Sequence, residues 1–346
     1  ILYENYTTAL QIGNFKGINL NICEINKIPK FRRQVKSIYE FGPKIFSFVK
    51  YLSFANSIVP MGGNNIVVSV HNKSGSRDIN GLFQQVDPQL KIFAGENKQG
   101  EKFLQKVGLK GEERFVCLIV RDQAYLSSPI YDYHSFRNSD IDTYEEAALA
   151  LTKKGYWVFR MGKAVEEEFI ANHPQVIDYA TSTWRDDFLD IWLMANCEFC
   201  ISTSTGFDSL ATAFRKPLAL VNYMPLAEFQ TWSSCVLAPS HLIWEKSGRK
   251  LSCREHLEHC YLRLEEYVNT GINVQELSSS EILGVVNELE LRLSKKWVDS
   301  DKASASQQRF WEIYKSGGGW TPHDAYFHPE ARLSSEFLEL NPEFLS

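Results

Sequence analysis

Residues 115–120 have the sequence FVCLIV and are followed at once by Arg121 and Asp122. An uninterrupted apolar run of this length is typical of a strand that is buried on both faces, as in a parallel sheet. Charged residues directly after such a strand lie at its carboxyl end, which is where ligands bind in open α/β sheets. This stretch therefore predicts a parallel sheet with a candidate site at its carboxyl edge.

Downstream of this strand, short apolar runs alternate with helical patterns. The rhythm is that of βαβ units, so we predict an α/β fold with a doubly wound parallel sheet. The further strands are expected over residues 156–161 (YWVFRM), 176–179, 198–202 and 217–222, and the helices over 143–154, 163–172, 185–195 and 207–214.

The chain has 346 residues, which is enough for two domains of about 100 to 200 residues each. We expect an amino-terminal domain over residues 1–110 and a Rossmann-like domain over 111–300. The helix and tail over 301–346 are expected to pack back on the first domain. That first domain holds few strand candidates, 66–70 and 89–93, and is expected to be incomplete.

The overall composition is that of an ordinary folded protein. Hydrophobic residues make up 44% and charged residues 23%, which argues against a disordered or fibrous chain. A net charge of -5 argues against a dedicated nucleic-acid-binding protein. The seven cysteines, an odd number, favour reduced thiols. No apolar run reaches the roughly 18 residues of a membrane span, and the first residues lack a signal-peptide pattern. We therefore expect a cytoplasmic protein.

Residues 27–50 form a basic stretch with seven lysines and arginines and one glutamate. Apolar residues at helical spacing accompany these charges. Two interpretations are open: peripheral contact with the inner face of an anionic membrane, or a solvated helix face packed on its own domain. The second is the more common use of such a pattern.

Residues 202–208 have the sequence STSTGFD, at the end of an expected strand and before an expected helix. Neither of the Gly-rich phosphate motifs GxxxxGK[ST] and GxGxxG occurs, which disfavours a P-loop enzyme or a simple dehydrogenase. Hydroxyls and free backbone N–H groups at a helix start suit a diphosphate, and glycine lets a ligand approach the backbone. The alternative is ordinary helix capping. The candidates for binding a diphosphate here are Ser202, Thr203, Ser204, Thr205 and Gly206.

Polar side chains also follow the other expected strands. Arginine suits phosphate because its planar fork donates two parallel hydrogen bonds, and several arginines would neutralise a leaving diphosphate without a metal. The alternative for each arginine alone is a surface ion pair, such as Arg137 with Asp140. The further candidates for binding the diphosphate or the rest of its ligand are Arg121, Arg137, Arg160 and Asn222. The candidates for accepting a proton in catalysis are Asp122, His134 and Asp140.

Two cysteine patterns are weaker candidates. The C-x2-H-x2-H-C pattern at residues 253–260 matches no common zinc spacing, and its glutamates indicate a solvated helix. The C-x-x-C at residues 197–200 lies between a helix and a strand, where two buried thiols are expected rather than a redox site. We therefore expect no metal site and no cofactor.

Several short motifs resemble a known family when they are taken in order along the chain. They are FVC at 115–117, RD at 121–122, FRNSDI at 136–141, GYWV at 155–158, IDYA at 177–180, STSTGFD at 202–208 and VNYMPL at 221–226. With these motifs the chain resembles a family of glycosyltransferases of surface-polysaccharide biosynthesis, over about residues 85–258. The spacing His134-x-x-Arg137-x-x-Asp140 is also similar to the HxRxxD loop of GT-B fucosyltransferases.

The resemblance implies a GT-B-like fold, in which two Rossmann-like domains enclose a central crevice. It implies that the carboxyl-terminal domain holds a nucleotide-sugar donor and that a hexosyl or deoxyhexosyl group moves to a glycan or lipid-linked acceptor. Two alternatives stay open. One is a nucleotide-sugar epimerase or hydrolase on the same fold, and the other is a non-catalytic subunit of a glycan-assembly complex.

Overall fold

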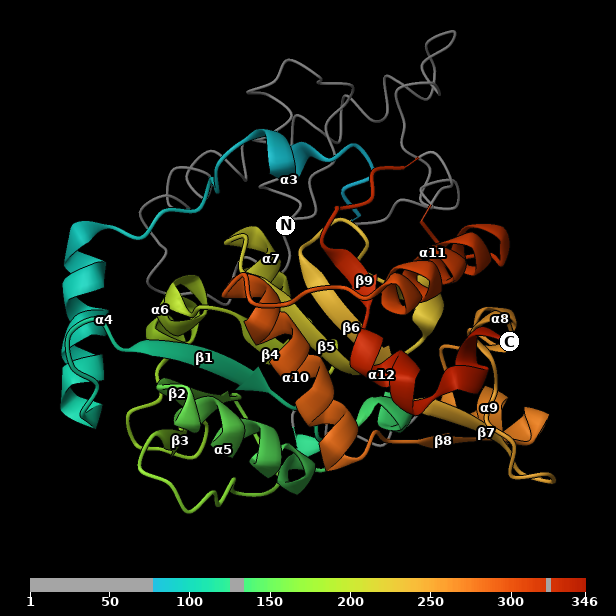
Figure 1. Ribbon diagram of the computed structural model, residues 1–346. Helices are drawn as coiled ribbons and strands as arrows, with labels where there is room; N and C mark the ends of the chain where they lie inside the picture. Colours follow the sequence, from blue (N-terminus) through green and yellow to red (C-terminus); the bar gives the residue numbers. More distant parts are fainter. Residues whose placement is uncertain (1–76, 125–133, 322–324) are drawn as a thin grey trace, which may run out of the picture.

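The computed structural model describes residues 77–124, 134–321 and 325–346, which form an α/β structure around a parallel seven-stranded sheet (Figure 1). The strand order is β3-β2-β1-β4-β5-β6-β9. The predicted parallel α/β sheet is therefore confirmed. Its strands are β1 (Arg114–Ile119), β2 (Tyr156–Met161), β3 (Val176–Asp178), β4 (Cys200–Ser202), β5 (Leu218–Tyr223), β6 (Cys235–Pro239) and β9 (Ala331–Leu333).

Helices and one two-stranded antiparallel sheet surround this sheet. The smaller sheet consists of β7 (His241–Trp244) and β8 (Ile272–Gln275). The α-helices are α3 (Leu82–Gln85), α4 (Ala94–Val107), α5 (Glu145–Lys153), α6 (Asp187–Asn196), α7 (Ser209–Ala213), α8 (Cys253–Glu258), α9 (Leu264–Thr270), α10 (Ser279–Leu293), α11 (Asp301–Ser316) and α12 (Ser335–Leu340). The 3-10 helices are η5 (Ile141–Tyr144), η6 (Leu226–Glu228) and η7 (Pro342–Leu345).

Successive strands are added to the sheet first on one side of β1 and then, from β4 onward, on its other side, so the order of strands reverses between β1 and β4. The chain runs outward from β1 to β2 and β3, then returns to place β4 on the other side of β1. Because parallel crossovers are right-handed, the helices on the two sides of this reversal cover opposite faces of the sheet. The carboxyl ends of β1 and β4 therefore border the crevice in which open α/β sheets bind ligands.

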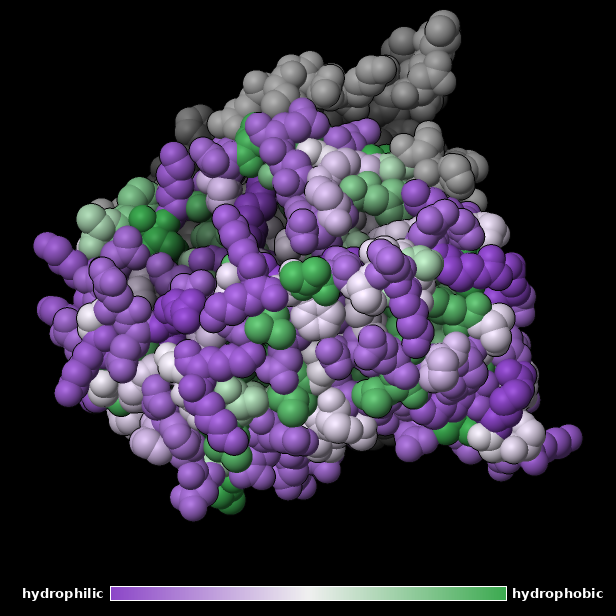
Figure 2. Space-filling view, viewed as in Figure 1, coloured by the Kyte–Doolittle hydropathy of each residue, from purple (hydrophilic) through white to green (hydrophobic). Residues whose placement is uncertain are grey.

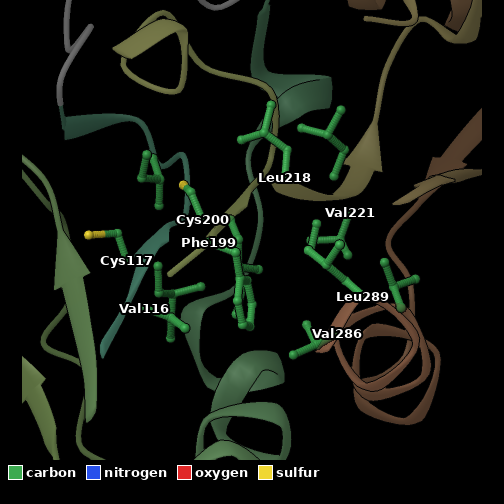
Figure 3. Packing of buried hydrophobic residues seen from close by; sticks show 14 of the residues in the cluster. Val116, Cys117, Phe199, Cys200, Leu218, Val221, Val286 and Leu289 are labelled. Carbon is green, nitrogen blue, oxygen red and sulfur yellow. The ribbon is translucent and has the colours of Figure 1, made fainter. Parts of the chain in front are cut away.

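Apolar side chains fill the space between the sheet and its helices. Val286 and Leu289 of α10 face Val221 of β5 across this core (Figure 3). These three side chains are at most 2% exposed, and burial of each stabilises the fold by roughly 1.5 to 3 kcal/mol. The outer surface on this side is largely hydrophilic, with only scattered apolar spots (Figure 2). The helix layer is therefore amphipathic, as solvent-facing helices are.

The other face of the sheet is covered by α6, against which α4 packs. Phe115 of β1 stacks on Trp192 of α6, with ring centroids 6.5 Å apart. The Trp192 indole N–H donates to Asn97 Oδ1 over 3.0 Å. A Cβ at Gly100 of α4 would lie 2.0 Å from the Trp192 ring, so this close approach of helix and indole requires glycine.

The tail completes the sheet, because β9 pairs with β6 at its edge. The buried Glu288 of α10 holds this tail by accepting from Ser334 Oγ (2.8 Å) and from the Ser335 N–H (2.7 Å). The Tyr326 backbone N–H in this tail donates to the Ile79 carbonyl over 2.8 Å, and the packing of the tail on a first domain stays a prediction. Contacts with residues 1–76 lie outside the described residues. Within the described ranges no helix is both long and apolar enough to cross a membrane.

Two local expectations were wrong. Residues 163–172 were expected to be helical but form a loop, because carboxylates bind its backbone: Asp122 accepts from the Glu166 N–H and Asp178 from the Phe169 N–H, each over 2.8 Å. Residues 89–93 were expected to form a strand but lead into α4. The expected strand at 66–70 and the basic stretch at 27–50 lie outside the described residues.

Candidate functional site

The ends of β1 and β4 are joined directly at the reversal of the sheet. The backbone N–H of Arg121, which follows β1, donates to Thr203 Oγ1 over 2.9 Å. The loop before η5 reaches the same point, since the Ser139 N–H donates to the Arg121 carbonyl (2.9 Å) and Arg121 Nε to Asn138 Oδ1 (3.3 Å). Three separate segments therefore meet where a doubly wound sheet binds its ligand.

The STSTGFD turn is held together by a carboxylate that sequence reasoning did not single out. Asp208 is fully buried, and its Oδ2 accepts from Ser202 Oγ (2.8 Å) and from the Thr205 N–H (3.0 Å). Burial raises the pKa of Asp208 to about 6, although the hydrogen bond from Ser202 lowers it. Three backbone N–H groups of the turn, those of Ser204, Thr205 and Phe207, donate to side chains within it. The helix expected over residues 207–214 begins only at Ser209.

The tip of the turn is its open part. Ser204 has a φ of 61°, in the left-handed region that non-glycine residues seldom adopt. Gly206 is exposed, its N–H donates to no other described group, and a Cβ there would meet nothing within 4 Å. The chain itself therefore does not require glycine at this position, and a ligand has room to approach the backbone.

Arg137 ends a 3-10 turn over residues 134–137, in the segment before η5, and pairs with an acid from another element. Its Nη2 is 3.2 Å from Oε2 of Glu228 on η6, and its guanidinium lies 5.5 Å from the centre of the Phe136 ring. The ion pair with Asp140 considered above does not form. Asp140 instead caps η5 by accepting from the Asp142 N–H over 2.9 Å, and it is exposed.

His134 lies within the field of three arginines. Burial lowers its pKa, and Arg137, Arg121 and Arg263 lower it further in that order. Arg263 directly precedes α9. Its place in the sequence did not mark it as a candidate site residue, because it follows no expected strand. We refer to Arg121, Arg137 and Arg263 as the arginine cluster. Such a concentration of positive charge at the carboxyl edge of the sheet suits a multiply charged anion.

Asp122 and Arg160 hold a loop beside this cluster. The Asp122 carboxylate accepts from the Ala124 N–H (3.0 Å) and the Glu166 N–H (2.8 Å) and lies 3.5 Å from Arg160 Nη2. Arg160 is 1% exposed and also binds Asp178, 3.4 Å away. Arg160 was expected to bind the donor, but in this structure its guanidinium is enclosed by carboxylates beneath the surface. Asp122 would have to give up these partners to accept a proton.

Asn222 was also expected to contact the donor, but its amide is used inside the protein. Its Nδ2 donates to Ser139 Oγ (2.9 Å) and to the Tyr144 hydroxyl (3.2 Å), and its Oδ1 accepts from the Leu277 N–H (2.7 Å). Ser139 Oγ in turn donates to Glu276 over 2.6 Å. Asn222 therefore positions the loop that carries Arg137 rather than the ligand.

The cysteines and histidines of the two cysteine patterns are buried or half-buried. Cys253 and His256 of α8 are buried, and burial lowers the pKa of His256 to about 3. Cys197 and Cys200 are buried as well, and burial raises the pKa of the Cys200 thiol. Across the ranges that the structure describes, no group of three His, Cys, Asp or Glu residues could hold a metal ion.

A cavity of about 700 Å³ lies away from the arginine cluster, lined by residues 83–89, Lys91 and Arg215. Arg215 precedes β5, so this cavity lies toward the amino edge of the sheet, whereas ligands in such folds bind at the carboxyl edge.

Comparison with protein-family models, with curated proteins and with solved structures found no match to this chain. The geometry at the carboxyl edge is therefore the basis for the functional proposal.

Proposed function

We propose that the chain is a glycosyltransferase that moves a sugar from a nucleotide-sugar donor to a glycan or lipid-linked acceptor. The observation that carries the proposal is that hydrogen bonds join the segments bearing Arg121 and Arg137 at the reversal between β1 and β4. The leaving group of such a reaction is a nucleoside diphosphate, whose charge grows as the sugar bond breaks. Partly buried arginine donors such as Arg137 stabilise that charge, and the motif resemblance points to the same reaction.

In this proposal the diphosphate is bound mainly by side chains. Arg121 and Arg137 lie on segments that are tied together through Asn138 and Ser139, which supports a shared ligand. The open tip of the turn, at Ser204 and Gly206, supplies backbone contact. Because guanidinium groups carry the neutralising charge, the proposed transfer does not depend on a divalent cation.

We assign His134 as the group that accepts the proton of the acceptor hydroxyl. A histidine with a lowered pKa is neutral at physiological pH, and a neutral imidazole can accept a proton. Asp122 is engaged by Arg160 and two backbone N–H groups. Asp140 is exposed and caps η5. Both carboxylates are therefore weaker candidates.

The two-domain GT-B arrangement is part of this proposal and rests on the resemblance. The described residues supply one Rossmann-like sheet, and residues 1–110 would supply the acceptor side. Peripheral membrane contact through residues 27–50, from the cytoplasmic side, would bring a lipid-linked acceptor to the site. A test is whether the protein sediments with anionic vesicles at low salt but not with neutral ones.

The decisive experiment is a thermal-shift screen of the full chain with UDP-, GDP-, CDP- and CMP-sugars and the free nucleotides. A ligand that binds only the folded state raises the unfolding temperature, and at about 100 times its dissociation constant it adds about 2.7 kcal/mol. We expect one nucleotide class to stabilise the protein and to be turned over with EDTA present. Stabilisation by no nucleotide would overturn the proposal.

Turnover assays separate the alternatives. A transferase consumes the donor only when an acceptor glycan is present, whereas an epimerase or hydrolase consumes it alone. A non-catalytic subunit would show no donor binding by calorimetry. Loss of turnover in EDTA, restored by magnesium or manganese, would refute the metal-independent mechanism and direct attention to Asp140 and Asp142.

A further inference from the structure

Arg137 and Glu228 form an ion pair inside the candidate site. Their charged atoms Nη2 and Oε2 are 3.2 Å apart, and the side chains are only 15% and 28% exposed. Exposed ion pairs are screened by water and contribute little, but a pair at this depth is screened less. The Glu228 carboxylate therefore occupies a position where an anion is bound by Arg137.

The guanidinium of Arg137 is only partly used by this contact. The Nε and Nη2 groups of an arginine form one edge that can bind two oxygens of a carboxylate or phosphate. Arg292 uses both groups, donating to Glu288 Oε1 from Nε (3.0 Å) and from Nη2 (2.8 Å). Arg137 uses Nη2 alone, and its buried Nε has no acceptor among the described residues. The edge of Arg137 is therefore half-filled.

The element that carries Glu228 is firmly held. The Tyr223 hydroxyl donates to the Glu228 carbonyl over 2.9 Å. The neighbouring Ala227 carbonyl accepts from the Tyr314 hydroxyl (3.0 Å) and from the backbone N–H of Trp320 (2.9 Å). With the backbone of η6 fixed from both sides, the Glu228 carboxylate can leave Arg137 by side-chain rotation alone, without any change in the fold.

We propose that Glu228 is an exchangeable counter-ion of Arg137, which a phosphoryl group entering the site displaces in order to bind both Nε and Nη2. The inference rests on the proposed function only in taking a diphosphate as the natural ligand. Until the ligand arrives, Glu228 neutralises the partly buried guanidinium. Because Glu228 competes with the incoming anion for Arg137, it lowers the affinity of the site for all anions. Ligands with more than one negative charge overcome this competition better than single carboxylates do, so Glu228 determines specificity.

Calorimetry with inorganic pyrophosphate tests this inference on the full chain. We compare the wild type with Glu228→Gln, Arg137→Ala and the double variant. Glu228→Gln keeps the side-chain shape, and removal of the competing charge should tighten pyrophosphate binding about fivefold. In the Arg137→Ala background the same substitution should change affinity less than about twofold, because the guanidinium for which Glu228 and pyrophosphate compete is absent. The control is Glu312→Gln, which removes a charge from the exposed Arg309–Glu312 pair on α11.

The outcomes distinguish this inference from the proposed function. Unchanged or weaker pyrophosphate binding by Glu228→Gln overturns the inference, as does a gain that persists without Arg137. Absence of pyrophosphate binding in every variant overturns it too. If the gain is found while no nucleotide sugar is bound or turned over, Glu228 is a counter-ion in an anion site of another function. If nucleotide sugars are turned over without the gain, the proposed function stands and the inference falls.

Discussion

The backbone N–H of Arg121 donates to Thr203 Oγ1 over 2.9 Å, which joins the residue after β1 to the turn after β4. The two residues are far apart in the sequence but adjacent at the reversal of the sheet. Thr203 is fully buried, so this hydrogen bond is shielded from water. It sets the position from which the Arg121 side chain extends toward the loop that carries Arg137.

Replacement of Thr203 by valine should destabilise the protein. Valine keeps the shape of threonine but removes the acceptor of the Arg121 N–H, and an unsatisfied buried donor costs about 1 to 3 kcal/mol. We expect this loss in the free energy of unfolding measured with urea. Thr203→Ser retains the hydroxyl and should lose less; equal losses in both variants would mean that the methyl group, not the hydrogen bond, matters.

Replacement of Arg137 by alanine should weaken nucleoside-diphosphate binding roughly tenfold to a hundredfold. A charge-assisted hydrogen bond from arginine to phosphate contributes about 1.5 to 3 kcal/mol. Lysine should restore little of the affinity, because a point charge cannot donate two parallel hydrogen bonds. Calorimetry measures the dissociation constants. Arg309→Ala, on the exposed surface of α11, serves as the control, and equal effects of the two alanine variants would exclude a specific role for Arg137.

Asp208 should make the stability of the protein depend on pH. Its pKa rises from an ordinary 3.8 to about 6 on folding because the carboxylate is buried. The folded state therefore holds the proton more tightly, so this contribution to stability is largest below about pH 4 and falls as the pH rises to about 6. In Asp208→Asn the amide oxygen can still accept from Ser202 and Thr205, but no charge is buried.

We therefore expect the stability of Asp208→Asn relative to the wild type to increase by on the order of 2 kcal/mol between about pH 4 and pH 7. Urea unfolding at several pH values measures this difference. Asp190, whose pKa is also raised to about 6 by burial, is present in both proteins and cancels in the comparison. A difference that stays constant with pH would contradict the assignment.

Replacement of Gly100 by alanine should destabilise the packing of α4 on α6. Alanine favours a helix over glycine by about 1 kcal/mol, but the new Cβ would lie 2.0 Å from the Trp192 ring. Overpacking of this kind costs about 1 to 3 kcal/mol and should outweigh the helix propensity. Thermal unfolding measures the net change. Gly95→Ala in the same helix meets nothing within 4 Å and should be neutral or stabilising. If both variants behave alike, the close approach is not rigid.

The sequence alone determined the class of the fold and the place of the candidate site. Continuous apolar runs and helical periodicity depend only on neighbouring residues, so β2 has the bounds expected from YWVFRM, and Arg121 and the STSTGFD turn do lie at the carboxyl edge. The helix expected over residues 163–172 failed because its backbone is bound by Asp122 and Asp178, whose contact with it exists only after folding.

Only the tertiary structure decided which polar residues are available to a ligand. Arg160 and Asn222 have the residue types and positions of ligand contacts, but they are buried among partners from distant segments. Arg263 joins the arginine cluster because the fold packs α9 against the segment before η5, where the Tyr267 and Phe136 ring centroids are 5.4 Å apart. Hydrogen bonds and ion pairs between distant residues depend on how the chain packs, and local sequence patterns carry no information about that packing.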